Sequence, residues 1–327
     1  MDSLGKIIRA IKSAPELKRK SPIGGAVFRL ANPAGETRVR AGMGEDAGAI
    51  RVPGGYVLLA ADGIWPLYLQ KDPFAAGRAL VIANTNDIYA MGGKPLGLAD
   101  VISVPDPKLA EPILKGIRTE IRRLRLPVVG GHLHPDAPAP GLAGAAVGLT
   151  SHLLMSSGAR VQDDVILAMD LRRGRRGKGG ARTWDTHHWK KSEQLLGDLG
   201  LLTRIAGEKS AHAAKDVSNG GIVTSLGMLL EASGRGAVIK LESVVYPEKI
   251  FTLSDWLLTF PSYGFVLTAP NRKSREIVRM FDRRGISAAV IGRVLKEKRL
   301  WLEYEGKREL LFDLTRNPIT GLRIKRL

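Results

Sequence analysis

Two aspartates flank a predicted β-hairpin. The strands cover 47–52 and 56–62, and a three-residue turn over 53–55 places Asp46 directly opposite Asp62, with Cβ atoms about 5 Å apart. Like charges at that distance repel unless a cation lies between them. Mg²⁺ binds to one or two carboxylates and keeps room for phosphate oxygens, so the pair predicts a Mg²⁺ site. The alternative is two solvated acids at strand ends.

A polar run interrupts an apolar helix that is predicted to end at Met91. Asp72 is the expected N-cap of this helix, and Pro73 is the proline of its first turn. Within it, Asn84 and Asp87 are three residues apart and share one face. A carboxylate inside a buried helix needs a partner. We therefore expect a functional pair, and an exposed polar stripe is the alternative.

A pair of glycines follows the strand predicted over 126–130. Gly130 and Gly131 would let backbone N–H groups approach a ligand closely, and His132 and His134 come directly after them. Two histidines without a third ligand are weak evidence for zinc. We expect a loop that contacts nucleotide or substrate.

A second glycine-containing turn precedes the apolar helix predicted over 221–232. Ser218 or Asn219 could cap this helix, whose N-terminus would attract an anion, and Asp216 could hold a metal ion beside that anion. An ordinary capped turn is the alternative.

Composition limits the classes of protein. The formal net charge is +18 and the pI about 10.2, which favours anionic partners, while the absence of cysteine excludes disulfides and thiolate metal sites. There is no signal-peptide pattern and no apolar stretch of about 18 residues, so we expect a soluble, cytoplasmic protein without a membrane role. A glycine-rich basic run suggests a nucleic-acid or polyphosphate contact or, alternatively, a mobile solvated loop. Its cations are Arg172, Arg173, Arg175, Arg176, Lys178 and Arg182.

Strands and helices alternate along the chain, which predicts an α/β (α+β) protein. Further strands are expected at 96–103, 126–130, 143–151, 164–170, 236–241, 264–268 and 287–293, and further helices at 107–124, 187–206, 221–232 and 271–284. A polar stretch near 156–163 suggests a boundary. We expect an N-terminal segment over 1–37 and domains over 38–155 and 156–327.

The order of these motifs resembles the aminoimidazole ribonucleotide (AIR) synthetase superfamily, which includes selenophosphate synthetase and thiamine-monophosphate kinase. The chain is most similar to the AIR synthase-related proteins of the methanogenesis marker protein 2 group. The motifs are Gly44-Glu45-Asp46-Ala47, Ala61-Asp62-Gly63, Asn84-Thr85-Asn86-Asp87, Gly130-Gly131-His132 and Asp216-Val217-Ser218-Asn219-Gly220-Gly221.

The resemblance implies a two-domain fold and a homodimer whose N-terminal sheets close into a barrel, with ATP bound through Mg²⁺. It implies that Asp46, Asp62 and Asp87 hold the metal, and that Asp62, Asp87 and Asp216 act in catalysis. The implied nucleotide contacts are Asp46, Asp62, Asn84, Asp87, Gly130, Gly131, His132, Ser218 and Asn219.

Departures from the superfamily pattern narrow the expected activity. Asn219 stands where characterised members often have aspartate, and no cysteine matches the reactive residues of selenophosphate synthetases or of the hydrogenase-maturation enzyme. We expect an ATP/Mg²⁺-dependent enzyme that acts on a small anionic metabolite by phosphoryl transfer or phosphate activation. A nucleotide-binding regulator without turnover is the alternative, and a basic nucleic-acid-binding protein is the less favoured one.

Overall fold

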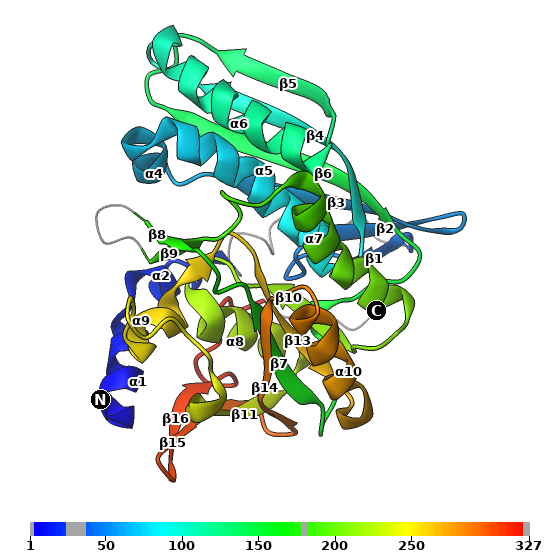
Figure 1. The fold of residues 1–327 in the computed structure, drawn as a ribbon, viewed down its shortest axis with the longest axis vertical. Helices are drawn as coiled ribbons and strands as arrows, with labels where there is room; N and C mark the ends of the chain where they lie inside the picture. Colours follow the sequence, from blue (N-terminus) through cyan, green and yellow to red (C-terminus); the bar gives the residue numbers. More distant parts are fainter. Residues whose placement is uncertain (1–2, 24–36, 178–181, 323–327) are drawn as a thin grey trace.

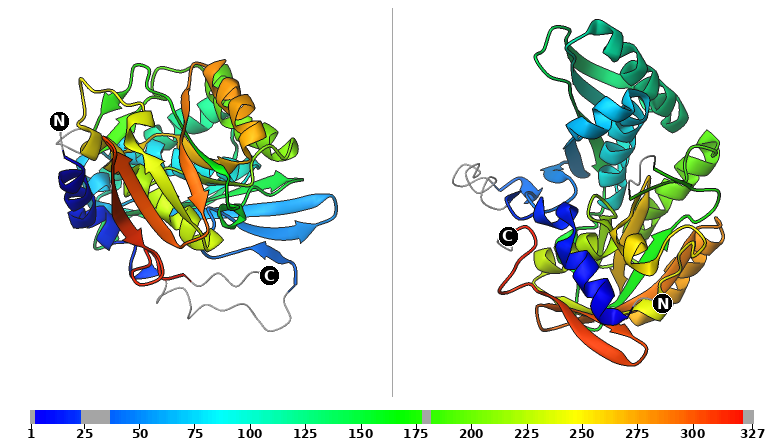
Figure 2. Two further views of the ribbon diagram at one scale, coloured as in Figure 1. Left: turned by 90° about the horizontal axis from the view of Figure 1, so that it is seen from below. Right: turned by 90° about the vertical axis from the view of Figure 1, so that its left-hand side faces the viewer.

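A computed structural model describes residues 3–23, 37–177 and 182–322. Two large sheets organise the molecule, and each is formed by one half of the chain (Figures 1 and 2). The first sheet is complete at Thr150 and the second begins at Asp164, so residues 151–163 connect them.

The first sheet has six strands in the order β1-β2-β3-β6-β4-β5. All neighbours are antiparallel except β4 and β5, which are parallel. The strands are β1 (Val39–Ala41), β2 (Gly48–Val52), β3 (Gly55–Gly63), β4 (Lys94–Ser103), β5 (Val128–His134) and β6 (Gly141–Thr150).

Helices cover one face of this sheet: α4 (Pro66–Lys71), α5 (Pro73–Ala90) and α6 (Ala110–Leu124), the last preceded by a 3₁₀ turn over Pro107–Leu109. Helix α5 lies next to the sheet and α6 packs closely on it, because glycines stand at their contact. A Cβ on Gly77 would come within 2.2 Å of the Ile113 carbonyl oxygen, and one on Gly116 within 2.1 Å of that of Phe74. Asp72 caps α5 by accepting a 2.9 Å hydrogen bond from the Ala75 amide, as predicted.

The second sheet has seven strands in the order β10-β13-β7-β14-β11-β15-β16, antiparallel except for β11 and β15. Its strands are β7 (Asp164–Met169), β10 (Ala213–Asp216), β11 (Gly236–Lys240), β13 (Gly264–Ala269), β14 (Ser287–Leu295), β15 (Arg299–Tyr304) and β16 (Lys307–Asp313). A small sheet joins β8 (Arg175–Arg176), β9 (Thr183–Asp185) and β12 (Phe260–Pro261).

Both faces of the second sheet are covered, as the fully buried strand β7 requires. Alternate β7 residues face opposite layers. Ile166 and Ala168 belong to a core shared with α7 (Ser192–Gly207) and α10 (Asn271–Asp282), which extends into the first half of the chain. Val165 and Leu167 belong to a second core with α8 (Gly221–Ser233) and α9 (Leu253–Leu258).

The N-terminal helices α1 (Leu4–Ser13) and α2 (Pro15–Lys18) lie against the C-terminal half. The apolar stripe of α1, with Leu4, Ile7, Ile8 and Ile11, is buried in the second core. The N-terminal helices therefore pack on the C-terminal half, and the two halves also share the first core.

The hairpin register differs from the prediction. The turn has two residues, with Gly54 at φ 81°, so Val52 pairs with Gly55 and each later pair shifts by one residue. Asp46 lies before β2, and Asp62 pairs with Gly144 of β6 instead. The expectation that Asp46 stands directly opposite Asp62 was wrong.

The glycine pair is not in a loop. Strand β5 begins at Val128 and continues through Gly130, Gly131 and His132 to His134, because it pairs with β4 along its whole length. Pairing with a neighbour outweighs the weak strand preference of glycine. The helix expected over 187–206 begins only at Ser192.

Candidate functional site

Four aspartates from four elements meet where the two halves of the molecule join. Asp46 lies before β2, Asp62 near the end of β3, Asp87 in the last turn of α5, and Asp216 at the end of β10. Carboxylate oxygens of Asp46, Asp87 and Asp216 all lie within 4.8 Å of one another, and Asp62 is hydrogen-bonded to Asp87. We call these four residues the acid cluster.

Lysines compensate part of this negative charge. Lys215 is buried and forms an ion pair with Asp46, whose other carboxylate oxygen accepts a 3.1 Å hydrogen bond from the Asp216 amide. Lys20, from the N-terminal segment, also lies in the field of the acid cluster: burial and Lys215 lower its pKa, while Asp216, Asp62 and Asp46 raise it. Four carboxyl groups thus share two nearby lysines.

The acids respond to burial and to one another. Burial, followed by the charges of its acidic neighbours, raises the pKa of Asp87 well above its ordinary value. The same causes raise the pKa of Asp216 to about 8, and burial also raises that of Asp62. Burial alone would lower the pKa of Lys215, but the charge of Asp46 raises it. The cluster therefore favours any added cation, whether a proton or a metal ion.

The polar run in α5 leaves two amide oxygens without a partner. Asn84 Nδ2 donates to the Leu80 carbonyl at 2.9 Å, and Asn86 Nδ2 donates to the Ser262 carbonyl at 2.9 Å. Among the described residues, no hydrogen-bond donor reaches either Oδ1 atom, although both are buried. The carboxylates of the acid cluster are hard oxygen donors, the kind of ligand that Mg²⁺ prefers. The residues present fit a magnesium ion.

The turn after β10 presents the start of α8 on the same side as Asp216. Gly220 is the N-cap residue, with φ 103°, and no side chain caps the helix, so the expected cap by Ser218 or Asn219 is absent. The Ser218 amide instead donates to Ser225 Oγ at 3.0 Å. Gly221 allows a close approach, because a Cβ there would lie 2.4 Å from the Leu258 carbonyl carbon.

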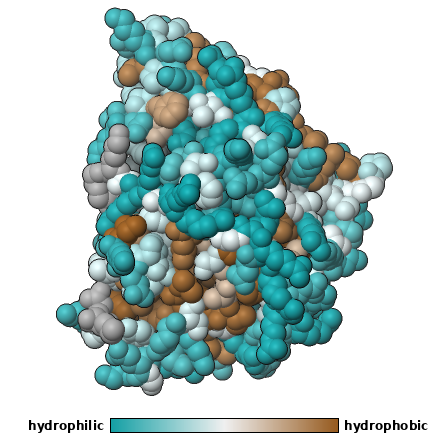
Figure 3. All heavy atoms as spheres, in the orientation of Figure 1, coloured by the Kyte–Doolittle hydropathy of each residue, from teal (hydrophilic) through white to brown (hydrophobic). Residues whose placement is uncertain are grey.

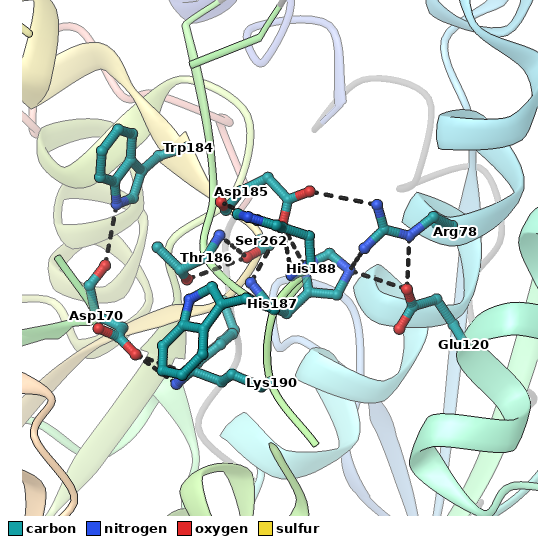
Figure 4. A network of polar contacts seen from close by, with 12 residues as sticks. Arg78, Glu120, Asp170, Trp184, Asp185, Thr186, His187, His188, Lys190 and Ser262 are labelled. Carbon is teal, nitrogen blue, oxygen red and sulfur yellow. Dashed lines mark hydrogen bonds and ion pairs between the residues drawn. The ribbon is translucent and has the colours of Figure 1, made fainter. Parts of the chain in front are cut away.

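A buried ionic network joins α5 and α6 to the segment around β9 in the C-terminal half (Figure 4). Arg78, from α5, contacts Glu120 of α6 at 2.6 Å, Asp185 at 3.4 Å and His187 Nε2 at 2.7 Å. His187 in turn lies 3.2 Å from Glu120 and 2.9 Å from Asp185. Because α5 carries Arg78, Asn86 and Asp87, this network fixes the helix of the acid cluster against the C-terminal half.

His187 gives this network a pH dependence. Burial opposes the charge of His187, but hydrogen bonds to Asp185 and Glu120 raise its pKa. In turn, although burial raises the pKa of Glu120, contacts with His187 and Arg78 lower it to about 2. A histidine whose pKa is higher in the folded than in the unfolded state stabilises the fold below about pH 6.5. This contribution is lost as the pH rises through the histidine pKa of the folded state.

Replacing His187 by glutamine (H187Q) is expected to lower the melting temperature by about 4 °C or more at pH 6, corresponding to roughly 2 kcal/mol, and by less above pH 8. Thermal scans between pH 5.5 and 8.5 test this. H188Q is the matched control, since His188 is less buried and hydrogen-bonds the backbone of Asp185. Parallel pH curves for wild type and H187Q would contradict the assignment.

Family comparison supports the two-domain division of the site. The model for AIR synthase related protein, N-terminal domain, matches residues 44–150, and the model for the C-terminal domain matches residues 175–305. The chain belongs to the AIR synthase-related family. The resemblance inferred from the motifs is thereby confirmed. None of the described helices is long and apolar enough to cross a membrane.

Relatives of this AIR synthase-related protein include an uncharacterized protein of Synechocystis, 34% identical over 85% of this chain and 86% of its own. A second is the selenide, water dikinase of Myxococcus xanthus, which is 26% identical; the match covers 76% of this chain and 82% of the dikinase. Among solved structures, T. maritima PurL complexed with FGAR has a TM-score of 0.75 at 14% identity. It covers 99% of this chain, which spans 54% of PurL. AaThiL complexed with AMPPCP and TMP has a TM-score of 0.64 at 19% identity. The match covers 86% of this chain and 91% of AaThiL.

The family motifs separate into two places in one chain. Asp46, Asp62, Asp87 and Asp216 come together, Asn84 precedes Asp87 in α5, and Ser218 and Asn219 follow Asp216 after Val217. The other group, Gly130, Gly131 and His132, lies in the edge strand β5, at the far end of the first half from β10 (Figure 1). There Gly131 neighbours Asp100 of β4 rather than the acid cluster.

Sequence reasoning missed three residues of the site. Lys215 directly precedes Asp216, and its place in that motif was a usable signal. Glu45 accepts hydrogen bonds from the Ser156 and Ser157 amides at 2.5 and 3.1 Å, which ties the first half to the connection after β6. Lys20 reaches the acid cluster only through tertiary folding, so no local pattern marks it.

The basic run was expected to contact nucleic acid or polyphosphate or, alternatively, to form a mobile solvated loop, and several arginines in its described part form internal ion pairs. Arg172 forms a two-pronged ion pair with Asp170, at 2.9 and 2.8 Å. Arg175 and Arg176 form β8, and Arg182 contacts Glu16 and Asp255 at 3.4 Å each. Asp170 is close to Arg172 in sequence, whereas Glu16 and Asp255 are far from Arg182. Lys178 lies outside the described residues.

Proposed function

We propose that this protein is an ATP- and Mg²⁺-dependent enzyme that transfers or activates a phosphoryl group on a small anionic metabolite. The observation that carries the proposal is the acid cluster, in which carboxylate oxygens of Asp46, Asp87 and Asp216 lie within 4.8 Å of one another. Related proteins support it: one is named a dikinase, and PurL and ThiL structures carry ATP, ADP or AMPPCP.

Asp46, Asp62 and Asp87 would hold the metal, and Asp216 would join them from the C-terminal half. When bound, Mg²⁺ neutralises phosphate charge and orients the phosphates for transfer. The protein's own part is positional: Lys215 forms an ion pair with Asp46, and the Arg78 network fixes α5. Ser218, Asn219 and the α8 N-terminus would contact the anionic substrate or phosphate.

Nucleotide binding without turnover is the second candidate, and Asn219 favours it. This half-buried amide stands where an acid would add a further charge beside Asp216. An amide can position a ligand but cannot act as a base.

An assay of phosphate fate separates the two candidates. The protein is incubated with ATP, Mg²⁺ and a fractionated metabolite pool, and ADP, AMP and new phosphorylated species are followed. Metabolite-dependent ADP or AMP release that D62N abolishes supports the enzyme. ATP binding without release under every fraction supports the regulator. D100N, another partly buried acid with a raised pKa on β4, is the matched control and should behave as wild type.

We also propose a homodimer closed through the first sheet into a barrel. The sheet face opposite α5 and α6 has no covering layer among the described elements and exposes apolar side chains, including Ile50, Leu59, Val101 and Leu149. Strand β5 leaves one edge unpaired. A second copy would cover both, and would bring Gly130, Gly131 and His132 into a shared site.

The substitution L59E is expected to give monomers with unchanged far-UV circular dichroism, because Leu59 is 53% exposed in one chain. Sedimentation equilibrium at micromolar concentration tests this, with wild type expected as a dimer. E309Q, on the exposed β16, is the control for a surface substitution. A monomeric wild type would contradict the dimer.

A further inference from the structure

Three helices form one continuous side of the molecule. In Figures 1 and 2, α6, α7 and α10 lie along the same side, and Figure 3 shows this side as mostly hydrophilic. Contacts join them: Arg125, after α6, pairs with Glu193 of α7, and Arg284, after α10, contacts Asp198 of α7 at 2.5 Å. The side chains exposed here therefore form a single surface.

This surface carries rows of cations without ion-pair partners. On α6 the row has i, i+3 and i+7 spacing, and on α10 it has i, i+3, i+7 and i+11 spacing. The members are exposed, and none forms an ion pair within the described structure: Lys115, Arg118, Arg122, Arg272, Arg275, Arg279 and Arg283. We call these seven residues the basic face.

Acids on the same helices are largely occupied elsewhere. Glu193 pairs with Arg125, Glu208 with Arg204 at 2.7 Å, and Glu276 with Lys273 at 2.8 Å. Glu111 and Asp282 are the exposed acids left over against the seven cations. The excess positive charge is thus a property of this surface and not only of the whole chain.

The arrangement on α10 works against the stability of the helix. Arginines at i and i+4 repel each other, and Arg272 stands in a first turn that contains no acid, where the helix dipole disfavours a cation. The dipole favours Arg279 and Arg283, in the last turn and at the C-cap, whereas Arg272 and the i, i+4 repulsion have no compensating ion pair within the described structure. A sequence that breaks a local rule without a structural gain points to a function for the residues concerned.

We propose that the basic face binds the backbone of double-stranded nucleic acid without reading its sequence. The α10 row rises about 16 Å along the helix, a length over which a duplex carries about nine phosphates. Single strands are usually held by stacking on aromatic side chains, but the only aromatic residue in α6, α7 and α10 is Phe281, which is buried. The basic run over 172–182 is not this surface, because Arg172 and Arg182 are engaged in internal ion pairs.

The test is fluorescence anisotropy of a labelled 20-base-pair DNA duplex of mixed sequence at 50, 100 and 200 mM NaCl. The wild type is expected to bind with an affinity that falls steeply with salt. R275Q/R279Q/R283Q should lower the log–log salt slope by ~2.7 and weaken binding about 10-fold or more at 100 mM NaCl. K296Q/K298Q/K307Q removes the same charge from exposed positions around β15 and β16 and should leave binding nearly unchanged.

Three results would overturn the proposal. The first is no binding of the duplex at 50 mM NaCl. The second is an equal loss in both triple variants, which would assign the effect to net charge. The third is preferential binding of a single-stranded oligonucleotide, or of vesicles with 30% phosphatidylserine, over the duplex. Both triple variants should keep the wild-type response to ATP and Mg²⁺, which shows that they fold and separates this proposal from the nucleotide site.

Discussion

D87N is expected to raise the melting temperature of the unliganded protein by about 2 °C or more and to remove the shift produced by ATP and Mg²⁺. Asp87 is buried among Asp216, Asp62 and Asp46, and its raised pKa means that its ionised form destabilises the fold. Asparagine removes that charge at nearly constant shape. The substitution also removes a carboxylate that would bind the metal ion, so the stabilisation that follows from binding ATP and Mg²⁺ is lost.

The sign of the pH dependence follows from the same shift. An acid with a raised folded-state pKa destabilises the fold increasingly as the pH rises above about 3.8, until the folded-state value is reached. The pKa of Asp216, raised to about 8, acts in the same direction. The gain in melting temperature from D87N should therefore be larger at pH 7.5 than at pH 4.5.

Thermal scans with and without 1 mM ATP and 5 mM MgCl₂ measure both effects. D100N is again the control, because it removes an acid with a raised pKa at a position on β4, and it should retain the full ligand-induced shift. If D87N unfolds without ligand, or keeps the shift, Asp87 is a structural acid and the proposed metal site is misplaced.

K215M is expected to lower the melting temperature by about 6 °C or more at pH 7.5, and 10 mM MgCl₂ should restore most of the loss. Removing one partner of a buried ion pair costs roughly 3–5 kcal/mol, because the other charge stays buried. Here Asp46 would lose Lys215 while Asp87 and Asp216 remain beside it. A divalent cation can take the place of the lost ammonium group.

A second buried lysine provides the control. Lys190 forms ion pairs with both Asp170 and Asp198, so K190M should also destabilise the protein. In this variant Asp170 would keep Arg172 as its partner and Asp198 would keep Arg284. No carboxylate would then be left unpaired for Mg²⁺ to bind. Rescue of both variants by MgCl₂, or of neither, would contradict the specific role of the acid cluster.

Local sequence signals predicted the elements that position the site. The cap at Asp72 identified the start of α5, and the predicted end at Met91 differs from the observed end at Ala90 by one residue. The order of the acidic and glycine motifs identified the family and the members of the acid cluster. These features succeed because caps, turns and apolar periodicity are properties of a few neighbouring residues.

Features that depend on distant partners were not predictable in the same way. The number of residues in the turn at Gly54 decides which side chains face each other, and one residue of difference moved Asp46 out of register with Asp62. Strand β5 extends through Gly130 only because β4 pairs with it. Lys20 is brought to the acids by the packing of α1 and α2, and Asp255, far away in sequence, pairs with Arg182.

Isothermal titration calorimetry of ATP into the wild-type protein, with 5 mM MgCl₂ or with EDTA, tests the central claim most directly. We expect saturable binding with Mg²⁺, at least 10-fold weaker binding with EDTA, and loss of this difference in D87N, because the acid cluster repels bare phosphate and accepts it only through a cation. Equal affinity with Mg²⁺ and with EDTA, or binding that D87N leaves unchanged, would show that the acid cluster is not a metal–nucleotide site.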